Sequence, residues 1–194
     1  MYSEHLMNQN VFMYHGHRVI KFPMGGENMK IGLLIIDMQN VFLRGFKNKG
    51  ALEDMTGYIN YVADLLRSNG HCIVLVQDVE GADDPDSELF DVIPEIQVGE
   101  QDIRIRKEAS NAFWDTKLQE ILIENEVDLV IVSGFAAEHC VLFTYNGAIE
   151  RGFQAVMLQH GILSLHDEAV QSTYQYRNVI SHPVVEWLMS SSRS

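Results

Sequence analysis

The sequence is poor in cysteine and in positive charge. Cys72 and Cys140 are its two cysteines, too few for a disulfide framework, so we expect free thiols and a reducing, cytoplasmic compartment. Lys and Arg together number 14 against 27 Asp and Glu, which gives a formal net charge of −13. Such a charge repels the phosphates of nucleic acids and anionic lipids. We therefore expect no nucleic-acid partner and no binding to a membrane surface.

Long apolar runs are missing as well. The longest, such as residues 31–36 and 129–132, have the length of a strand and fall far short of the roughly 20 residues that span a bilayer. We therefore expect no membrane span. The N-terminus has no basic segment leading into an apolar one, so we also expect no secretory signal.

With 46% apolar residues, the chain is long enough for one sizeable core and short for two.

The first 28 residues differ in character from the rest. They contain a Gly25-Gly26 pair and one alternating segment, Val11–Phe22, that fits an edge strand. A compact α/β domain can start at Met29 without them. We therefore divide the chain into an N-terminal extension, 1–28, and a domain, 29–194, and regard the extension as a candidate for packing or subunit contact.

Strand and helix patterns alternate along the remaining chain. The strands are expected at residues 31–36, 72–76, 103–105, 129–132, 155–158 and 179–181. The helices are expected at residues 52–66, 118–125, 140–152 and 167–176, and after Pro183. This alternation is typical of a single three-layer α/β/α domain, Rossmann-like, with a mainly parallel six-stranded sheet.

The segment from Val130 to Val141 predicts a buried strand that turns sharply into a helix. Four residues rich in β-branched side chains precede Gly134, and Cys140 falls in the first turn of the expected helix. The positive end of the helix dipole there favours a thiolate, which is the nucleophilic form of cysteine. A small buried core residue is the alternative reading of Cys140.

Asp37 and Lys107 also come at the ends of predicted strands. Because the carboxyl ends of parallel strands meet at one edge of a sheet, we expect both residues to share a cleft with Cys140. The carboxylate can accept the thiol proton and later protonate a leaving group, while the ammonium stabilises the negative charges. Taken singly, a loop carboxylate and a solvated lysine are the alternatives.

Three ordered blocks of the sequence resemble the isochorismatase-like, or nicotinamidase-related, cysteine hydrolases. The first is residues 34–42, LIIDMQNVF. The second comprises IRK at 105–107, SNAF at 110–113 and TKL at 116–118, and the third is SGFAAEHCV at 133–141. The order and spacing of the blocks agree with the family over about residues 30–182.

The resemblance implies a catalytic triad of Asp37, Lys107 and Cys140 that cleaves an amide or related C–N bond through a thioester. It also implies a cis peptide between Phe135 and Ala136. The backbone N–H groups of Ala136 and Cys140 would then form an oxyanion hole.

For the substrate, the resemblance implies a small-molecule amide. Phe42, Phe113 and Trp114 become candidates for the apolar wall of its pocket, with core packing as the alternative. Members of the family commonly self-associate, so we expect a homo-oligomer.

The nicotinamidase branch of the family binds a metal through an Asp, a His two residues later and further histidines. Here Asp78 occupies the first position, but Glu80 replaces the His, and no histidine lies between Glu80 and Lys107. We therefore expect no metal and no cofactor. A hard cation held by Asp78 and Glu80 is one alternative. The isochorismate-cleaving branch is another, but its active members commonly lack the cysteine, so Cys140 favours an amidase.

Other functions remain open from sequence alone. His160 or His166 could pair with Cys140 in a Cys-His scheme, whereas His139 should point about 100° away from its neighbour on a helix. A non-catalytic binding or scaffold protein, or a redox-responsive thiol protein, is a further alternative.

Overall fold

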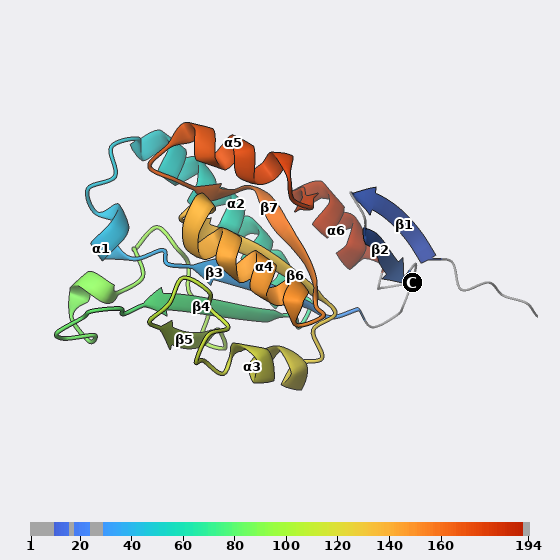
Figure 1. The fold of residues 1–194 in the computed structure, drawn as a ribbon, viewed down its shortest axis with the longest axis horizontal. Coiled ribbons are helices and arrows are strands. Elements are labelled where there is room, and N and C mark those ends of the chain that lie inside the picture. Colours follow the sequence, from blue (N-terminus) through green and yellow to red (C-terminus); the bar gives the residue numbers. More distant parts are fainter. Residues whose placement is uncertain (1–9, 16–17, 24–28, 192–194) are drawn as a thin grey trace, which may run out of the picture.

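Strand β3 (Ile31–Ile36) lies inside a six-stranded sheet and pairs in parallel with β4 and β6. This computed structural model describes residues 10–15, 18–23 and 29–191. Within the six-stranded sheet the strand order is β5-β4-β3-β6-β7-β8, and every pairing in this sheet is parallel (Figure 1). The other strands are β4 (Cys72–Asp78), β5 (Ile103–Lys107), β6 (Leu129–Phe135), β7 (Gln154–Leu163) and β8 (Val179–Ile180).

Helices cover both faces of this sheet. They are α1 (Asn40–Leu43), α2 (Lys49–Arg67), α3 (Leu118–Glu124), α4 (Leu142–Glu150), α5 (Asp167–Gln175) and α6 (His182–Ser191), with a 3-10 turn at Glu88–Phe90. Apolar residues of α2 and α6 share one core with one face of the sheet, and those of α3, α4 and α5 share a second core with the other. The predicted three-layer α/β/α class is confirmed.

Strand β7 is longer than the sequence predicted. Polar residues at Gln159 and His160 ended the expected strand at residue 158. The structure instead has a register shift opposite β6, after which pairing resumes with Gly134 against Ile162. His160 lies there at a φ of 61°, a left-handed conformation that lets the strand bend and continue.

The N-terminal segment also differs from expectation. Residues 11–22 were predicted as one piece suited to a sheet edge. They fall instead in two strands, β1 (Asn10–His15) and β2 (Arg18–Pro23), which pair antiparallel with each other in a separate two-stranded sheet. The remaining positions of 1–28 lie outside the described residues. Among the helices that the structure describes, none is long and apolar enough to cross a membrane.

Candidate active site

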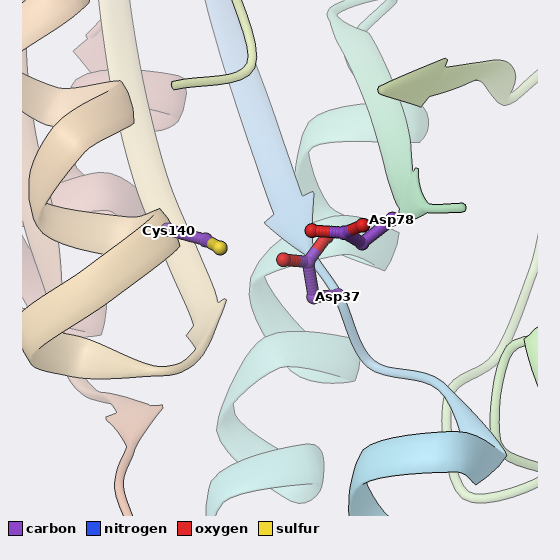
Figure 2. Close-up of side chains that lie close together, drawn as sticks. All are labelled: Asp37, Asp78 and Cys140. Atoms are coloured by element: carbon purple, nitrogen blue, oxygen red, sulfur yellow. The ribbon is translucent and has the colours of Figure 1, made fainter. Parts of the chain in front are cut away.

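Four ionisable residues meet at the carboxyl edge of the sheet. Asp37 follows β3, and Asp78 ends β4. Lys107 ends β5, and Cys140 lies in the turn that follows β6. Figure 2 shows the side chains of Asp37, Asp78 and Cys140 directed toward one another, and one ligand atom from each lies within 4.8 Å of the others. The structure thus brings the three residues predicted as a triad together, with Asp78 beside them.

The Lys107 ammonium joins the group. Its Nζ lies 2.9 Å from Oδ2 of Asp37, 2.5 Å from Oδ2 of Asp78 and 3.4 Å from Sγ of Cys140. Burial alone lowers the pKa of Lys107, but the negative charge of Asp37 and the bonds to both carboxylates outweigh it, so the pKa is raised. Lys107 is therefore a buried, permanently charged group.

Asp37 is buried and held in an uncommon backbone conformation, with a φ of 49°. Its N–H donates to the carbonyl of Val76 at 2.9 Å, which ties it to the end of β4. Burial raises the pKa of the Asp37 carboxyl, and although the Lys107 charge lowers it, the result is about 6 against an ordinary value of 3.8. Oδ1 of Asp37 has no hydrogen-bond partner among the described residues. The pKa of the Asp37 carboxyl thus lies near neutral pH, and its Oδ1 atom is available to accept a proton.

Cys140 lies in a wide turn, Ala137–Val141, that precedes α4. The carbonyl of Ala136 accepts the N–H groups of His139 and Val141 at 3.0 and 3.2 Å, so the backbone wraps around one oxygen. The peptide between Phe135 and Ala136 is cis. Just before it, Gly134 has a φ of 111°, and a Cβ there would collide with the backbone of Ile36. A glycine is therefore required for β6 to approach β3 at this point.

The charge state of Cys140 corrects the sequence expectation. A cysteine in the first turn of a helix was expected to ionise easily. Burial, and then the negative charge of Asp37, raise the pKa of the Cys140 thiol to about 12, and the nearby Lys107 ammonium offsets this only in part. Cys140 lies in the turn before α4, where burial and the Asp37 charge favour the neutral thiol, so it needs a base.

Asp78 and Gln39 lie beside the predicted triad; Asp78 was weighed only as a cation ligand with Glu80, and Gln39 was given no role. Oε1 of Gln39 accepts the Asp78 N–H at 2.7 Å, and its Nε2 donates to the Asp78 carbonyl at 3.1 Å and to the Phe90 carbonyl at 2.9 Å. The buried amide thus fixes the end of β4. The edge rule that placed Asp37 also applies to Asp78, which ends its own strand, and this signal was available in the sequence.

The pairing of Asp78 with Glu80 as cation ligands is not supported. Oδ1 of Asp78 accepts the backbone N–H of Glu80 at 2.9 Å, while Glu80 itself is exposed. Within the described ranges, the group with metal-ligand spacing consists of Asp37, Asp78 and Cys140. Lys107 contacts all three, so an ammonium already supplies the positive charge that these groups require.

The three aromatic candidates for the pocket differ in exposure and in their contacts. Phe42 is 38% exposed and stacks on Phe135 with ring centroids 6.0 Å apart, next to the cis peptide. Phe113 is only 5% exposed and stacks on Phe153, which follows the C-terminal end of α4, whereas Cys140 precedes its N-terminal end. Trp114 is 62% exposed. The structure brings Phe42 to the site, and it packs Phe113 into the core.

His139, His160 and His166, which were weighed against the Asp-Lys-Cys scheme, have no contact with the Cys140 thiol among those of the described residues. His139 is exposed on the turn, and His160 packs against Tyr58 with ring centroids 5.1 Å apart. His166 precedes α5 and donates its backbone N–H to Oγ of Ser164. The described neighbours of the Cys140 thiol are Asp37 and Lys107, so the geometry favours the Asp-Lys-Cys arrangement over a Cys-His pair.

Known proteins resemble this chain in sequence. The family model of the isochorismatase domain matches residues 32–187. An uncharacterized isochorismatase family protein of Bacillus subtilis, YrdC, is 24% identical over 152 residues, which is 75% of this chain and 80% of that protein. Streptothricin hydrolase of Streptomyces noursei is 28% identical over 141 residues, 70% of this chain and 54% of its own length.

Solved structures show the same fold. An isochorismatase-like hydrolase from Alkaliphilus metalliredigens superposes with a TM-score of 0.71 at 21% identity, covering 84% of this chain and 98% of that one. N-carbamoylsarcosine amidase from Thermoplasma acidophilum gives 0.68 at 24% identity, covering 79% and 95%. From the match to the family model, together with the fold, the chain belongs to the isochorismatase family of hydrolases.

Proposed function

We propose that this protein is a cysteine hydrolase that cleaves an amide or related C–N bond of a small molecule. The observation that carries the proposal is the Lys107 ammonium, which contacts a carboxyl with a pKa of about 6 on one side and a partly buried thiol on the other. Among similar proteins, one is an N-carbamoylsarcosine amidase and another a streptothricin hydrolase, both consistent with this chemistry.

In the first half of the proposed reaction, the free Oδ1 of Asp37 accepts the proton of Cys140. The Sγ atom then forms a bond to the acyl carbon of the substrate, and negative charge develops on the acyl oxygen. The backbone N–H groups of Ala136 and Cys140 are the proposed donors to that oxygen. Lys107 stays in place and balances the charge as it moves from carboxylate to sulfur.

In the second half, Asp37 delivers its proton to the amine nitrogen as the C–N bond breaks, which leaves a thioester on Cys140. A water molecule then loses a proton to Asp37 and attacks the thioester carbon. The C–S bond breaks, the acid product leaves, and the proton on Asp37 returns to the sulfur. The same carboxyl serves as acid and as base, which suits a pKa of about 6.

The proposal has three further parts. Phe42 would form part of the substrate wall, since it lies at the edge of the site and is partly exposed. We also propose that the chain self-associates and is cytoplasmic, as the family resemblance and the two free thiols suggest. Residues 29–194 are proposed as the folding domain and residues 1–28 as an added segment.

An ammonia-release screen tests the function. Nicotinamide, carbamoyl and ureido compounds and small diacid monoamides are offered to the wild type and to Cys140→Ala, with Cys72→Ala as the matched loss of a thiol. We expect turnover of at least one compound that C140A abolishes and C72A retains. Undiminished turnover by C140A would exclude Cys140 as the nucleophile. Turnover of nicotinamide alone, abolished by a chelator, would instead support the metal-dependent branch.

A further inference from the structure

We propose that Asp78 is a fourth member of the site, a positioning residue that holds the Lys107 ammonium between Asp37 and Cys140 and keeps Asp37 available as a base. The inference deepens the proposed function and rests on it for its catalytic meaning. Its structural part stands by itself, on the contacts of one buried cation.

The contacts of Lys107 are saturated. An ammonium has three N–H donors, and its Nζ lies within 2.9 Å of Asp37, 2.5 Å of Asp78 and 3.4 Å of the Cys140 sulfur. The shortest of the three contacts goes to Asp78. No donor is left for a substrate, so Lys107 acts by its charge and its position, and Asp78 helps to fix both.

Asp78 is itself fixed on several sides. In the parallel pairing of β4 and β5 it is the register partner of Lys107, so the two side chains leave neighbouring backbones together. Gln39 clamps its N–H and its carbonyl, and its second carboxylate oxygen accepts the N–H of Glu80. A carboxylate held in this way keeps the Lys107 ammonium in one position. A solvated lysine side chain would instead occupy many rotamers.

The contact between Asp78 and Lys107 also affects the basicity of Asp37. The charged or titratable groups that act on Asp37 are Lys107 of β5, Asp78 of β4 and Cys140 of the turn. Lys107 favours the carboxylate, whereas the negative charge of Asp78 opposes it. If Asp78 loses its charge, Asp37 becomes the only carboxylate paired with the ammonium, and its affinity for a proton falls. A weaker base accepts the thiol proton less readily.

Alkylation of Cys140 tests this without a substrate. The rate of its reaction with iodoacetamide, followed by peptide mass spectrometry, should rise through an inflection near pH 6 as Asp37 ionises. In Asp78→Asn, which keeps the shape and loses the charge, we expect the inflection to move down by about one pH unit. The plateau rate should fall about three- to tenfold, because the base is weaker.

Two controls separate this effect from general damage. Asp102→Asn removes a buried carboxylate that pairs with Arg67 at 2.6 Å. Asp102 directly precedes β5, whereas Lys107 ends it, so the two lie at opposite edges of the sheet. It should leave the inflection in place. Gln39→Ala frees the backbone of Asp78 but keeps its charge, so a smaller shift in the same direction is expected. An inflection that D78N leaves unchanged or moves upward, or that D102N moves equally, would overturn the proposal.

A cadmium titration tests the competing role of Asp78 as a metal ligand. A metal held by Asp37, Asp78 and Cys140 would displace the ammonium and produce a thiolate-to-cadmium charge-transfer band, lost in both D78N and C140A. We expect no such band in the wild type, and its appearance would overturn the proposal. If the alkylation profile shifts as expected while no amide is turned over, the proposed function fails and the role of Asp78 stands.

Discussion

Replacing Lys107 with methionine removes the cation that contacts both buried carboxylates of the site. The methionine stem fills similar space, so the change is mainly one of charge. Asp37 and Asp78 are both buried and would be left without this ammonium. Removing one partner of a buried ion pair typically costs about 3–5 kcal/mol, because an uncompensated charge stays in a poorly solvated place. We expect a loss of this size in the free energy of unfolding at pH 8.

The loss should depend on pH, with a definite sign. In the wild type the pKa of Asp37 is raised from 3.8 to about 6, so the stability gained from its protonated form is fully present below pH 3.8 and is lost as the pH rises through about 6. That shift corresponds to about 3 kcal/mol. Without the Lys107 charge, which lowers this pKa, the folded-state value rises further. K107M should therefore come closest to the wild type at pH 5 and differ most at pH 8.

Urea unfolding followed by circular dichroism at pH 5 and pH 8 measures the difference in the free energy of unfolding between K107M and the wild type. The matched control is Arg106→Met, the neighbouring residue of β5, whose pair with Asp86 is 50% and 78% exposed. Exposed pairs contribute less than about 1 kcal/mol, so R106M should differ little from the wild type at either pH. The reasoning is refuted if K107M loses no more stability than R106M at pH 8, or if its deficit grows on going to pH 5.

Three further changes probe other parts of the structure. Gly134→Ala introduces a Cβ against the Ile36 backbone at positive φ and should cost on the order of 3 kcal/mol in thermal or urea unfolding. Phe42→Ala should raise KM on the order of tenfold with little loss of stability, whereas Phe113→Ala should cost about 3–5 kcal/mol of stability and leave KM alone; equal effects would contradict the assignment. A chain that begins at Met29 should fold but lose self-association in light scattering, and an unchanged mass and Tm would exclude a packing role for the extension.

The position of the site was predictable because the sheet is parallel and buried on both faces. Continuous apolar runs mark where β3 and β6 lie, and their carboxyl ends place Asp37 and Cys140 at one edge. Lys107 follows from the same rule even though β5 is short and partly exposed. These predictions needed only the direction of the strands, which local sequence supplies.

What the sequence could not supply depends on contacts between distant residues. The pKa of Cys140 is set by burial and by Asp37, neither of which a helix-end argument contains. Asp78 was compared with a metal-binding pattern, so its partner Lys107, 29 residues away in the chain, was overlooked. For Phe113 the sequence left pocket wall and core packing open, because the Phe153 ring that stacks on it comes from beyond α4.

The two raised pKa values at this site have a common consequence. Burial makes any change of net charge costly in this cluster, and it raises the pKa of both Asp37 and Cys140. A proton that passes from sulfur to carboxylate leaves the total charge of the cluster unchanged, so this transfer avoids most of the desolvation cost that ionising Cys140 into water would incur. A nucleophile activated in this way should form only when an electrophilic carbon, such as the acyl carbon of a substrate or the methylene carbon of iodoacetamide, is in reach to accept the sulfur. The neutral resting thiol is thus compatible with catalysis, provided that Asp37 keeps one oxygen free for the proton.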